Sequence, residues 1–193
     1  GGRVGLNTLA NGKIYTETPF KNIYIFGAAG DSGGAPGSAL FAYHYILHNE
    51  TRSPVESLHF GSEYADEEIE RVLKNFSLNY EKIEGENRLI EKAADLLAKG
   101  KIIGWFQGRM EFGPRALGAR SILSRPNPRK MKEEVNKIKI REQFRPFAGS
   151  ILQEKVHEYF EVPKINHLSP FMTFCFKVKE EKREKLIAIV HKD

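Results

Sequence analysis

The sequence is almost without cysteine and has no long hydrophobic run. Its 193 residues include one cysteine, Cys175, which excludes an internal disulfide framework and any zinc site built from several cysteines. No apolar run reaches the roughly 20 residues that a membrane-spanning helix needs. The N-terminal GGRVGLNTLA lacks the basic and apolar regions of a secretory signal. We therefore expect a cytoplasmic protein with no membrane partner.

Acidic residues are sparse in residues 101–150, where twelve lysines and arginines accompany four acids. The whole chain carries a net charge of +5, so its positive charge is concentrated in this segment. Such a segment suits a phosphate-bearing ligand or nucleic acid, although a solvated basic face is the alternative. Because these basic residues stand among glycines and prolines rather than in a run, we expect a small anion and no nucleic acid.

The hydrophobic pattern alternates between helical and extended periods, which favours the α/β class. Helices are predicted over 33–48, from Asp66, over 87–99, around 156–160 and from Asn127, whose side chain is expected to cap its helix. Extended segments are predicted at 13–27, 101–106, 121–123, 146–152 and 170–178. The helix over 33–48 is apolar around much of its circumference, so we expect it to be buried. Residues 49–65 have no period and many turn formers, which indicates a linker.

The first candidate site is the glycine-rich loop Gly27–Gly37, GAAGDSGGAPG, which leads into a predicted helix. Backbone N–H groups in such loops can approach phosphate oxygens, and the helix N-terminus favours negative charge. The loop has neither the Gly-Lys-Ser/Thr of a Walker loop nor a GxGxxG pattern, so a tight structural turn remains the alternative to nucleotide binding. Asp31, its one acid, either binds a metal that accompanies phosphates or caps the helix.

The second candidate is the arginine motif Gly108–Ser121, GRMEFGPRALGARS, which follows a predicted buried strand. Arg109, Arg115 and Arg120 alternate here with glycines. Guanidinium groups match phosphate or carboxylate oxygens two at a time, and glycines let a ligand come close to the backbone. This spacing is unusual for a solvated face.

The third candidate is the segment 137–147, KIKIREQFRPF, here named the basic loop. Lys137, Lys139 and Arg141 alternate with apolar residues, so we expect them to project to one side of an extended chain. A proline follows Arg145 and restricts the backbone beside it. Together with the arginine motif, the basic loop predicts an anion pocket.

Two weaker candidates are a histidine pair and the cysteine. His44 and His48 stand four residues apart on a predicted helix, a spacing that can hold a metal, but no third ligand is evident nearby. Cys175 lies in an apolar segment without an adjacent histidine or lysine, so we expect a buried thiol rather than a nucleophile.

At these motifs the sequence resembles the O-carbamoyltransferase family, which includes the nodulation and antibiotic-tailoring carbamoyltransferases. GWFQGRMEFGPRALGARSIL and REQFRPFAGSIL resemble its C-terminal signature, and GGRVGLNTLANGKI with AAGDSGGAPGSAL resembles the end of its actin-like domain. The resemblance implies an α/β fold in three parts. They are a C-terminal remnant of an actin-like ATPase (ASKHA) domain over 1–48, a linker with a helix over 49–85, and most of a YrdC-like twisted-sheet carbamoyltransferase domain over 86–193.

The resemblance also implies a two-step transferase reaction. Carbamoyl phosphate and ATP yield carbamoyl-adenylate, and the carbamoyl group then passes to a hydroxyl of a small-molecule or sugar acceptor. The implied cofactors are ATP and a divalent metal, iron or magnesium. The alternatives are a hydrogenase-maturation type carbamoyltransferase, disfavoured because paired zinc-finger cysteines are missing, and an RNA-binding module related to tRNA modification.

Residue roles follow from the resemblance position by position. Arg115, Lys139 and Arg145 match catalytic positions, and the carbamoyl phosphate site adds Arg120 and Ser121. The nucleotide-contacting positions are Asn7, Gly30, Gly33 and Gly34, and Asp31 matches a metal ligand. Pro36 and Gly149 depart from the usual Leu and Pro. The final His191-Lys192-Asp193 looks like the start of the family's H-x-D-G-T segment, so we expect a piece of a longer protein that holds parts of both sites and is inactive alone.

Overall fold

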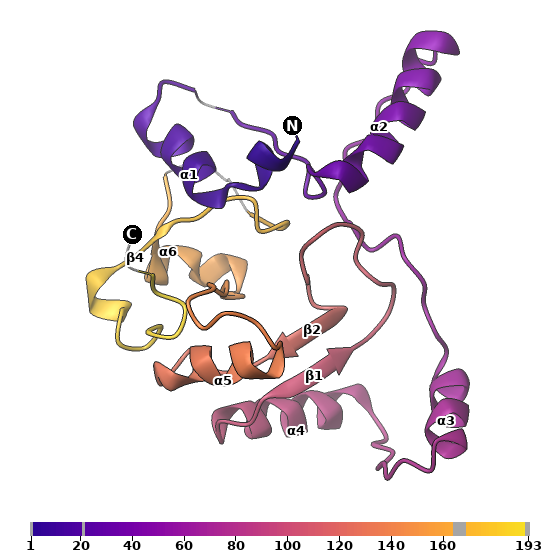
Figure 1. Cartoon of the computed structure of the whole chain (residues 1–193), viewed down its shortest axis with the longest axis vertical. Helices are drawn as coiled ribbons and strands as arrows, with labels where there is room; N and C mark the ends of the chain where they lie inside the picture. The colour runs from indigo at the N-terminus through magenta and orange to yellow at the C-terminus, as the bar shows by residue number, and fades with distance from the viewer. Residues whose placement is uncertain (1, 21, 164–168, 192–193) are drawn as a thin grey trace. The chain divides into compact units, whose positions relative to one another are not determined.

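Helices and short strands alternate along the chain and are joined by long irregular segments (Figure 1). The computed structural model describes residues 2–20, 22–163 and 169–191. Contacts within the chain divide it into two units. The first unit consists of the chain up to Phe60 with Glu111–Leu117 and Ser150–Glu180, and the second consists of Gly61–Met110, Gly118–Gly149 and the chain from Glu181 onward. Each unit therefore draws on segments that are distant in sequence.

The first unit is mostly helical. Its helical elements are η1 (Arg3–Leu6), α1 (Thr8–Glu17), η2 (Asp31–Gly33), α2 (Gly34–Phe41), η3 (Ala42–Ile46), η4 (Gln153–Lys155) and α6 (Val156–Tyr159). The strands β3 (Phe160–Glu161) and β4 (Lys177–Val178) pair antiparallel. The short helix η5 (Glu180–Lys182) follows β4 at the boundary between the units.

The second unit places helices beside a two-stranded sheet. Its elements are α3 (Asp66–Asn75), α4 (Glu86–Ala98), β1 (Ile103–Phe106), β2 (Arg120–Leu123) and α5 (Lys130–Ile138). The two strands pair antiparallel, with Ile103 opposite Leu123 and Phe106 opposite Arg120. Gly100, with a φ of 79°, ends α4 in the left-handed conformation that glycine adopts without strain, so the chain turns directly into β1.

The core of the second unit forms under α5. Met131 and Val135 of this helix are buried against Ala188, and the partly buried Ile102 and Phe147 pack on the same cluster. Phe147 is the last residue of the basic loop, so the core holds the far end of that loop. The helix thus connects the core to the segment that carries the candidate anion site.

The secondary structure confirms the mixed α/β character and several predicted elements. The helices α3 and α4, the strands β1 and β2 and the short helix α6 lie where the pattern predicted them. Residues 49–65 have no helix or strand, and the predicted domain boundaries stay predictions. The sheets of the described residues are two antiparallel pairs, and the actin-like and YrdC-like details of the predicted fold stay predictions.

Three predictions of secondary structure are wrong. Residues 13–17, predicted as extended, belong to α1, which begins where the Asn7 side chain accepts a hydrogen bond of 3.0 Å from the N–H of Ala10. The helix α5 begins at Lys130, and no side chain caps it, so Asn127 does not act as predicted. The predicted strand at 146–152 is absent, and within 170–178 only β4 is a strand.

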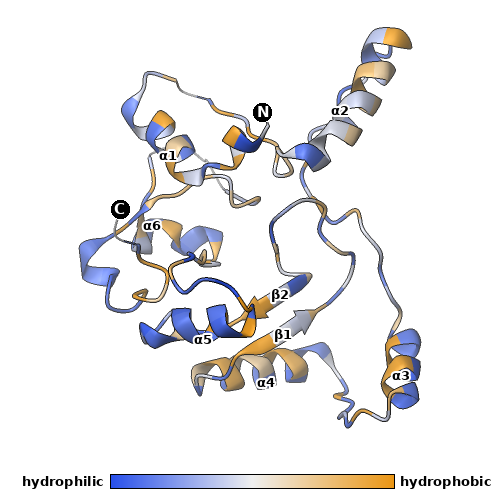
Figure 2. Cartoon of the chain, viewed as in Figure 1, coloured by the Kyte–Doolittle hydropathy of each residue, from blue (hydrophilic) through white to orange (hydrophobic). Residues whose placement is uncertain are grey.

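The predicted helix over 33–48 forms as α2 and the π-helical turn η3, but its burial was predicted wrongly. Leu40, Phe41 and Ile46 are 51%, 57% and 63% exposed. Figure 2 shows hydrophobic residues along α2. The rings of Phe41 and Tyr45 stack on each other with centroids 5.0 Å apart, which leaves their outer faces open to solvent. None of the helices that the structure describes combines the length and apolar character that crossing a membrane requires.

Candidate functional site

The basic loop begins with a tight turn rather than an extended chain. The N–H of Ile140 donates to the carbonyl of Lys137 at 3.0 Å, and the N–H of Arg141 donates to the carbonyl of Asn136 at 3.2 Å. These two bonds form the usual paired closure of a helix C-terminus. Lys137 therefore lies in the last turn of α5. The expectation that Lys137, Lys139 and Arg141 project to one side of an extended chain is wrong.

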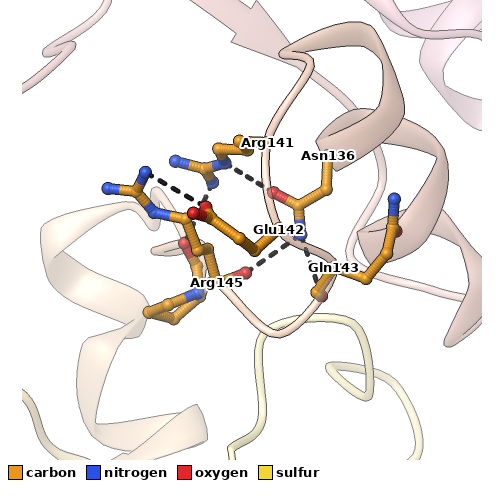
Figure 3. A network of polar contacts seen from close by, with 6 residues as sticks. Asn136, Arg141, Glu142, Gln143 and Arg145 are labelled. Carbon is orange, nitrogen blue, oxygen red and sulfur yellow. Dashed lines mark hydrogen bonds and ion pairs between the residues drawn. The ribbon is translucent and has the colours of Figure 1, made fainter.

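Asn136, which the sequence analysis missed, holds the loop from inside (Figure 3). Its side chain is fully buried at 0% exposure. Its Nδ2 donates to the carbonyls of Gln143 and Arg145, each at 3.1 Å, and its Oδ1 accepts from Nε of Arg141 at 2.6 Å. Both amide hydrogens and the amide oxygen are thus satisfied by the loop. A polar residue next to Val135 on the buried side of α5 was the available signal.

Arg141 is directed into the protein. Besides its bond to Asn136, its Nη2 donates to the carbonyl of Pro146 at 3.3 Å, and its guanidinium lies over the Phe147 ring with Cζ 4.5 Å from the centroid. Burial lowers the pKa of Arg141, and the nearby charge of Arg145 lowers it further. Side chains of the loop thus occupy the carbonyls of Gln143, Arg145 and Pro146, which are not available for pairing in a strand.

Lys139 and Arg145, the two predicted carbamoyl phosphate ligands of this loop, remain at the surface. Lys139 is exposed at the C-terminus of α5, and within the described part of the chain its ammonium makes no hydrogen bond or ion pair. Arg145 is 51% exposed and its Nη1 lies 3.5 Å from a carboxylate oxygen of Glu142. A shallow depression of about 480 Å³ lies on the same loop, lined by Lys137, Ile140, Arg141, Glu142 and Gln143 but not by Lys139 or Arg145. An anion can therefore reach this surface.

Arg120 is occupied by the backbone of its own unit. Its guanidinium lies over the Phe106 ring with Cζ 3.5 Å from the centroid. Its terminal nitrogens donate, at 2.8 to 3.2 Å, to the carbonyls of Gln107, Ala119, Gly108 and Ser62. The Ser121 hydroxyl accepts from the N–H of Gly118 at 3.0 Å. These contacts shape the ends of the arginine motif, and binding of carbamoyl phosphate by these two residues stays a prediction.

Arg115 belongs to the first unit, whereas Lys139 and Arg145 belong to the second. Its Nη2 donates to the carbonyl of Leu6 at 3.2 Å, and its buried Nε has no hydrogen-bond partner among the described residues. The neighbouring Gly113 has a φ of 111°, and a Cβ there would approach the Cβ of Ala28 to 2.9 Å. The middle of the arginine motif thus packs beside the glycine-rich loop.

The glycine-rich loop packs closely against its own backbone, and nucleotide binding by it stays a prediction. The N–H of Gly33 donates to the carbonyl of Gly30 at 3.0 Å, and a Cβ on Gly33 would come 2.3 Å from the Ala28 carbonyl oxygen. A Cβ on Gly34 would meet no atom within 4 Å, and the N–H of Gly34 donates to the carbonyl of Asp31. The side-chain oxygen of Asn7, the other predicted nucleotide contact, caps α1 by accepting a hydrogen bond from the N–H of Ala10.

Asp31 neither caps a helix nor lies in a metal centre of the described residues. Its carboxylate pairs with Arg3 at 2.9 Å, and both side chains are 82% exposed. No group of three histidine, cysteine, aspartate or glutamate side chains suitable for a metal occurs in the part of the chain that the structure describes. The residues present can therefore supply one ligand here and do not fit a complete metal site.

The two weaker candidates are the pair of His44 and His48, and Cys175. Nδ1 of His44 lies 2.7 Å from the carbonyl of Asn49, and His48 adopts a positive φ of 50°, so the pair does not form a metal site with a third described ligand. Cys175 is exposed, which corrects the expectation of a buried thiol. The end of the chain at Lys192 and Asp193 lies outside the described residues.

Two family models match the chain. Residues 94–193 match the one described as Carbamoyltransferase C-terminus, and residues 1–40 match the one described as Carbamoyltransferase N-terminus. The chain belongs to the carbamoyltransferase family. This confirms the family that the two pairs of motifs predicted. The arginine motif and the basic loop both lie in the C-terminal match, and the glycine-rich loop lies in the N-terminal match.

Similar proteins cover the chain almost completely but are much longer. A nodulation protein of Sinorhizobium fredii, NolNO, is 40% identical over all of this chain and 28% of its own length. The nodulation protein NolO of Bradyrhizobium diazoefficiens is 38% identical over all of this chain and 35% of its own length. An uncharacterized protein of Synechocystis sp. is 48% identical over 94% of this chain and 30% of its own. The chain thus spans about a third of the length of these relatives.

Proposed function

We propose that the whole protein is an O-carbamoyltransferase and that its basic loop binds the phosphate group of carbamoyl phosphate. The observation that carries this proposal is the exposure of Lys139 and Arg145 on one loop that belongs to the carbamoyltransferase C-terminal match. Glu142 is the only carboxylate within the loop. Two cations with one carboxylate between them leave a net positive charge for an anionic ligand.

The electrostatics of the loop support an anion at this place. The guanidinium of Arg145 lies close enough to Arg141 to lower its pKa, so the two cations repel each other in the empty loop. A phosphate beside Arg145 relieves this repulsion and adds charge-assisted hydrogen bonds. Its arrival also replaces the weak, exposed pairing of Arg145 with Glu142.

We further propose that the reaction proceeds through carbamoyl-adenylate and ends on an acceptor hydroxyl. Water would release phosphate from carbamoyl phosphate, the carbamate formed would react with ATP to give carbamoyl-adenylate and pyrophosphate, and transfer of the carbamoyl group to the hydroxyl would release AMP. Reactions among crowded phosphates require orientation and charge neutralisation, which cationic side chains supply without a protein nucleophile. The basic loop would orient and neutralise the donor.

The proposal is tested by calorimetric titration of the whole protein with carbamoyl phosphate, with inorganic phosphate as the reference anion, at two salt concentrations. We expect carbamoyl phosphate to bind more tightly than phosphate. Lys139→Ala or Arg145→Ala should each weaken binding by about 1.5 to 3 kcal/mol, the usual scale for a charge-assisted contact.

Lys130→Ala is the matched control, because it removes the same charge from the other end of α5. Lys130 is 70% exposed and lies 3.7 Å from Glu134. Its removal should leave the affinity for carbamoyl phosphate within about twofold, a free energy of about 0.4 kcal/mol. Failure of the whole protein to bind carbamoyl phosphate, or equal losses in all three variants, contradicts the proposed site.

A further inference from the structure

The turn that follows α5 is strained at Ile140. The helices α4 and α5 end with the same pair of backbone hydrogen bonds, and the residue after the cap is Gly100 in α4 but Ile140 in α5. The φ of Ile140 is 49°, a region that a β-branched residue strongly disfavours. Its side chain is 92% exposed, so burial does not compensate for this strain. Other contacts must hold the turn in place.

Asn136 supplies those contacts. Its buried amide makes hydrogen bonds to residues 141, 143 and 145, which follow the turn in the sequence. These bonds therefore connect the two sides of the turn. An amide buried without partners is costly, and here all its hydrogen-bonding groups are satisfied by this one segment. Asn136 and the fold of the basic loop are therefore mutually dependent. Strain that is held in place by a surrounding network is a recurrent feature of functional loops.

We propose that Asn136 is a positioning residue that holds the basic loop in the form in which Lys139 and Arg145 bind a phosphate group, with Arg141 as its partner. This inference rests on the proposed function. Arg141 acts inward, through Asn136, Pro146 and the Phe147 ring, and is not itself a ligand. Arg141 thus holds the turn, while Lys139 and Arg145 face the ligand.

The partner network explains why an amide stands at position 136 in a helix whose neighbouring inner positions are apolar. Val135 and Met131, on the same helix, are buried against the core cluster. An apolar residue at position 136 would fill the same space but leave the carbonyls of Gln143 and Arg145 without their donor. The two carbonyls flank Phe144, which is 76% exposed, so the core does not hold this part of the loop.

The decisive variant is Asn136→Asp in the whole protein. It keeps the size of the side chain and its oxygen toward Arg141, but it removes both N–H donors and places a carboxylate against two carbonyls. We expect the dissociation constant for carbamoyl phosphate to rise about tenfold or more, equivalent to about 1.4 kcal/mol. The preference for carbamoyl phosphate over inorganic phosphate should fall, and amide hydrogen exchange of residues 141–147 should accelerate.

Val135→Ala is the control for a purely structural effect. It lies beside Asn136, is buried at 4% exposure and packs in the core cluster, which meets the basic loop only at its last residue, Phe147. It should lower thermal stability while leaving the dissociation constant within about twofold, because the hydrogen bonds from Asn136 to the loop remain. Arg141→Lys is the second variant. It keeps the positive charge but loses the Nε bond to Asn136, and we expect it to weaken carbamoyl phosphate binding about fivefold through lost orientation.

The outcomes separate this inference from the proposed function. If Asn136→Asp and Arg141→Lys lower stability but keep the affinity and anion preference of the unsubstituted protein, the positioning role is overturned. Weakened binding in Lys139→Ala alongside that result would leave the proposed site intact. If Lys139→Ala and Arg145→Ala also bind normally, the proposed site itself is wrong. Should Asn136→Asp fail to fold, Arg141→Lys decides the question by the same measurements.

Discussion

At the scale of single residues, the left-handed backbone of Ile140 makes a specific prediction about stability. Asparagine tolerates this conformation better than isoleucine and does not add the flexibility of glycine. Because the Ile140 side chain is 92% exposed, its replacement gives up little buried surface. Ile140→Asn should raise the free energy of unfolding by about 1 kcal/mol, measured by urea denaturation.

Ile138 provides the comparison for this prediction, because it is the same residue type in the last turn of α5. It is 55% exposed and has a helical backbone. Ile138→Asn should lower the free energy of unfolding by a few tenths of a kcal/mol through reduced helix propensity, roughly 0.3. Changes of the same sign at both positions would show that the turn at Ile140 stores no strain.

A second residue-scale prediction concerns Asp31. Its ion pair with Arg3 is exposed on both sides, so Asp31→Ala should change the free energy of unfolding by less than about 0.5 kcal/mol. In the whole protein we expect this variant to lose bound metal and carbamoyl transfer while adenylate formation survives. Metal analysis and ATP–pyrophosphate exchange measure the two effects.

Arg3→Ala separates the carboxylate of Asp31 from the ion pair that it makes. This variant breaks the same pair but leaves Asp31 in place, so metal binding and transfer should be retained. Loss of adenylate formation in Asp31→Ala would show that this residue acts in adenylate formation, so its predicted role in the transfer step would be wrong. Equal metal loss in Arg3→Ala would mean that the ion pair, rather than the carboxylate, is what matters.

At the scale of elements, the exposed helix α3 is joined to the segment after it by one carboxylate. Glu70 lies 2.6 Å from Lys74, accepts from the Tyr80 hydroxyl at 2.9 Å and lies 3.5 Å from Lys82. The hydrogen bond from Lys74, then that from Tyr80, lowers the pKa of Glu70 from 4.5 to about 2. These partners therefore prefer the ionised carboxylate.

The sign of this shift determines the pH dependence. Because the pKa of Glu70 is lowered in the folded chain, its contribution is complete above about pH 4.5 and is lost as the pH falls toward 2. An NMR titration should show the Tyr80 ring signals shifting with a midpoint near pH 2. In Glu70→Gln this shift should vanish, and a persistent midpoint near 2 would assign it to another group.

The elements also show where the sequence pattern was sufficient. The helices α3 and α4 and the strand β1 follow local periodicity, and they lie where that pattern predicted them. The strand predicted at 146–152 is absent, and at its first residue Arg141 donates to the carbonyl of Pro146, a contact that periodicity does not encode. The start of α1 depended on one side-chain cap at Asn7, which outweighed the β-branched and aromatic residues that follow.

At the scale of the whole molecule, the net charge of +5 does not by itself create a surface that binds a polyanion. In residues 101–150, Arg120, Arg125 and Arg141 all donate to backbone carbonyls. A guanidinium bound to the protein's own backbone offers few donors to a phosphate chain. We therefore expect a small anion, rather than RNA, to be the preferred ligand of this segment.

A salt series on the whole protein tests that expectation. At about 0.15 M salt, single-stranded RNA should bind more weakly than carbamoyl phosphate, measured by fluorescence anisotropy and calorimetry. RNA affinity should also fall more steeply with salt, since each phosphate contact releases counterions. Tighter binding of RNA than of carbamoyl phosphate would favour the RNA-binding alternative.

The sequence alone was sufficient to find the family, through the resemblance of its motifs, and to predict the helices that follow local periodicity. The family models confirm the family, and the roles of the candidate residues stay predictions. Only the tertiary structure decided which arginines turn inward, since their partners are distant in sequence. Arg120 reaches the carbonyl of Ser62, 58 residues away, and Arg115 reaches that of Leu6, 109 residues away. The role of Asn136 also appeared only there, because a buried amide is recognised by the carbonyls that fold back onto it.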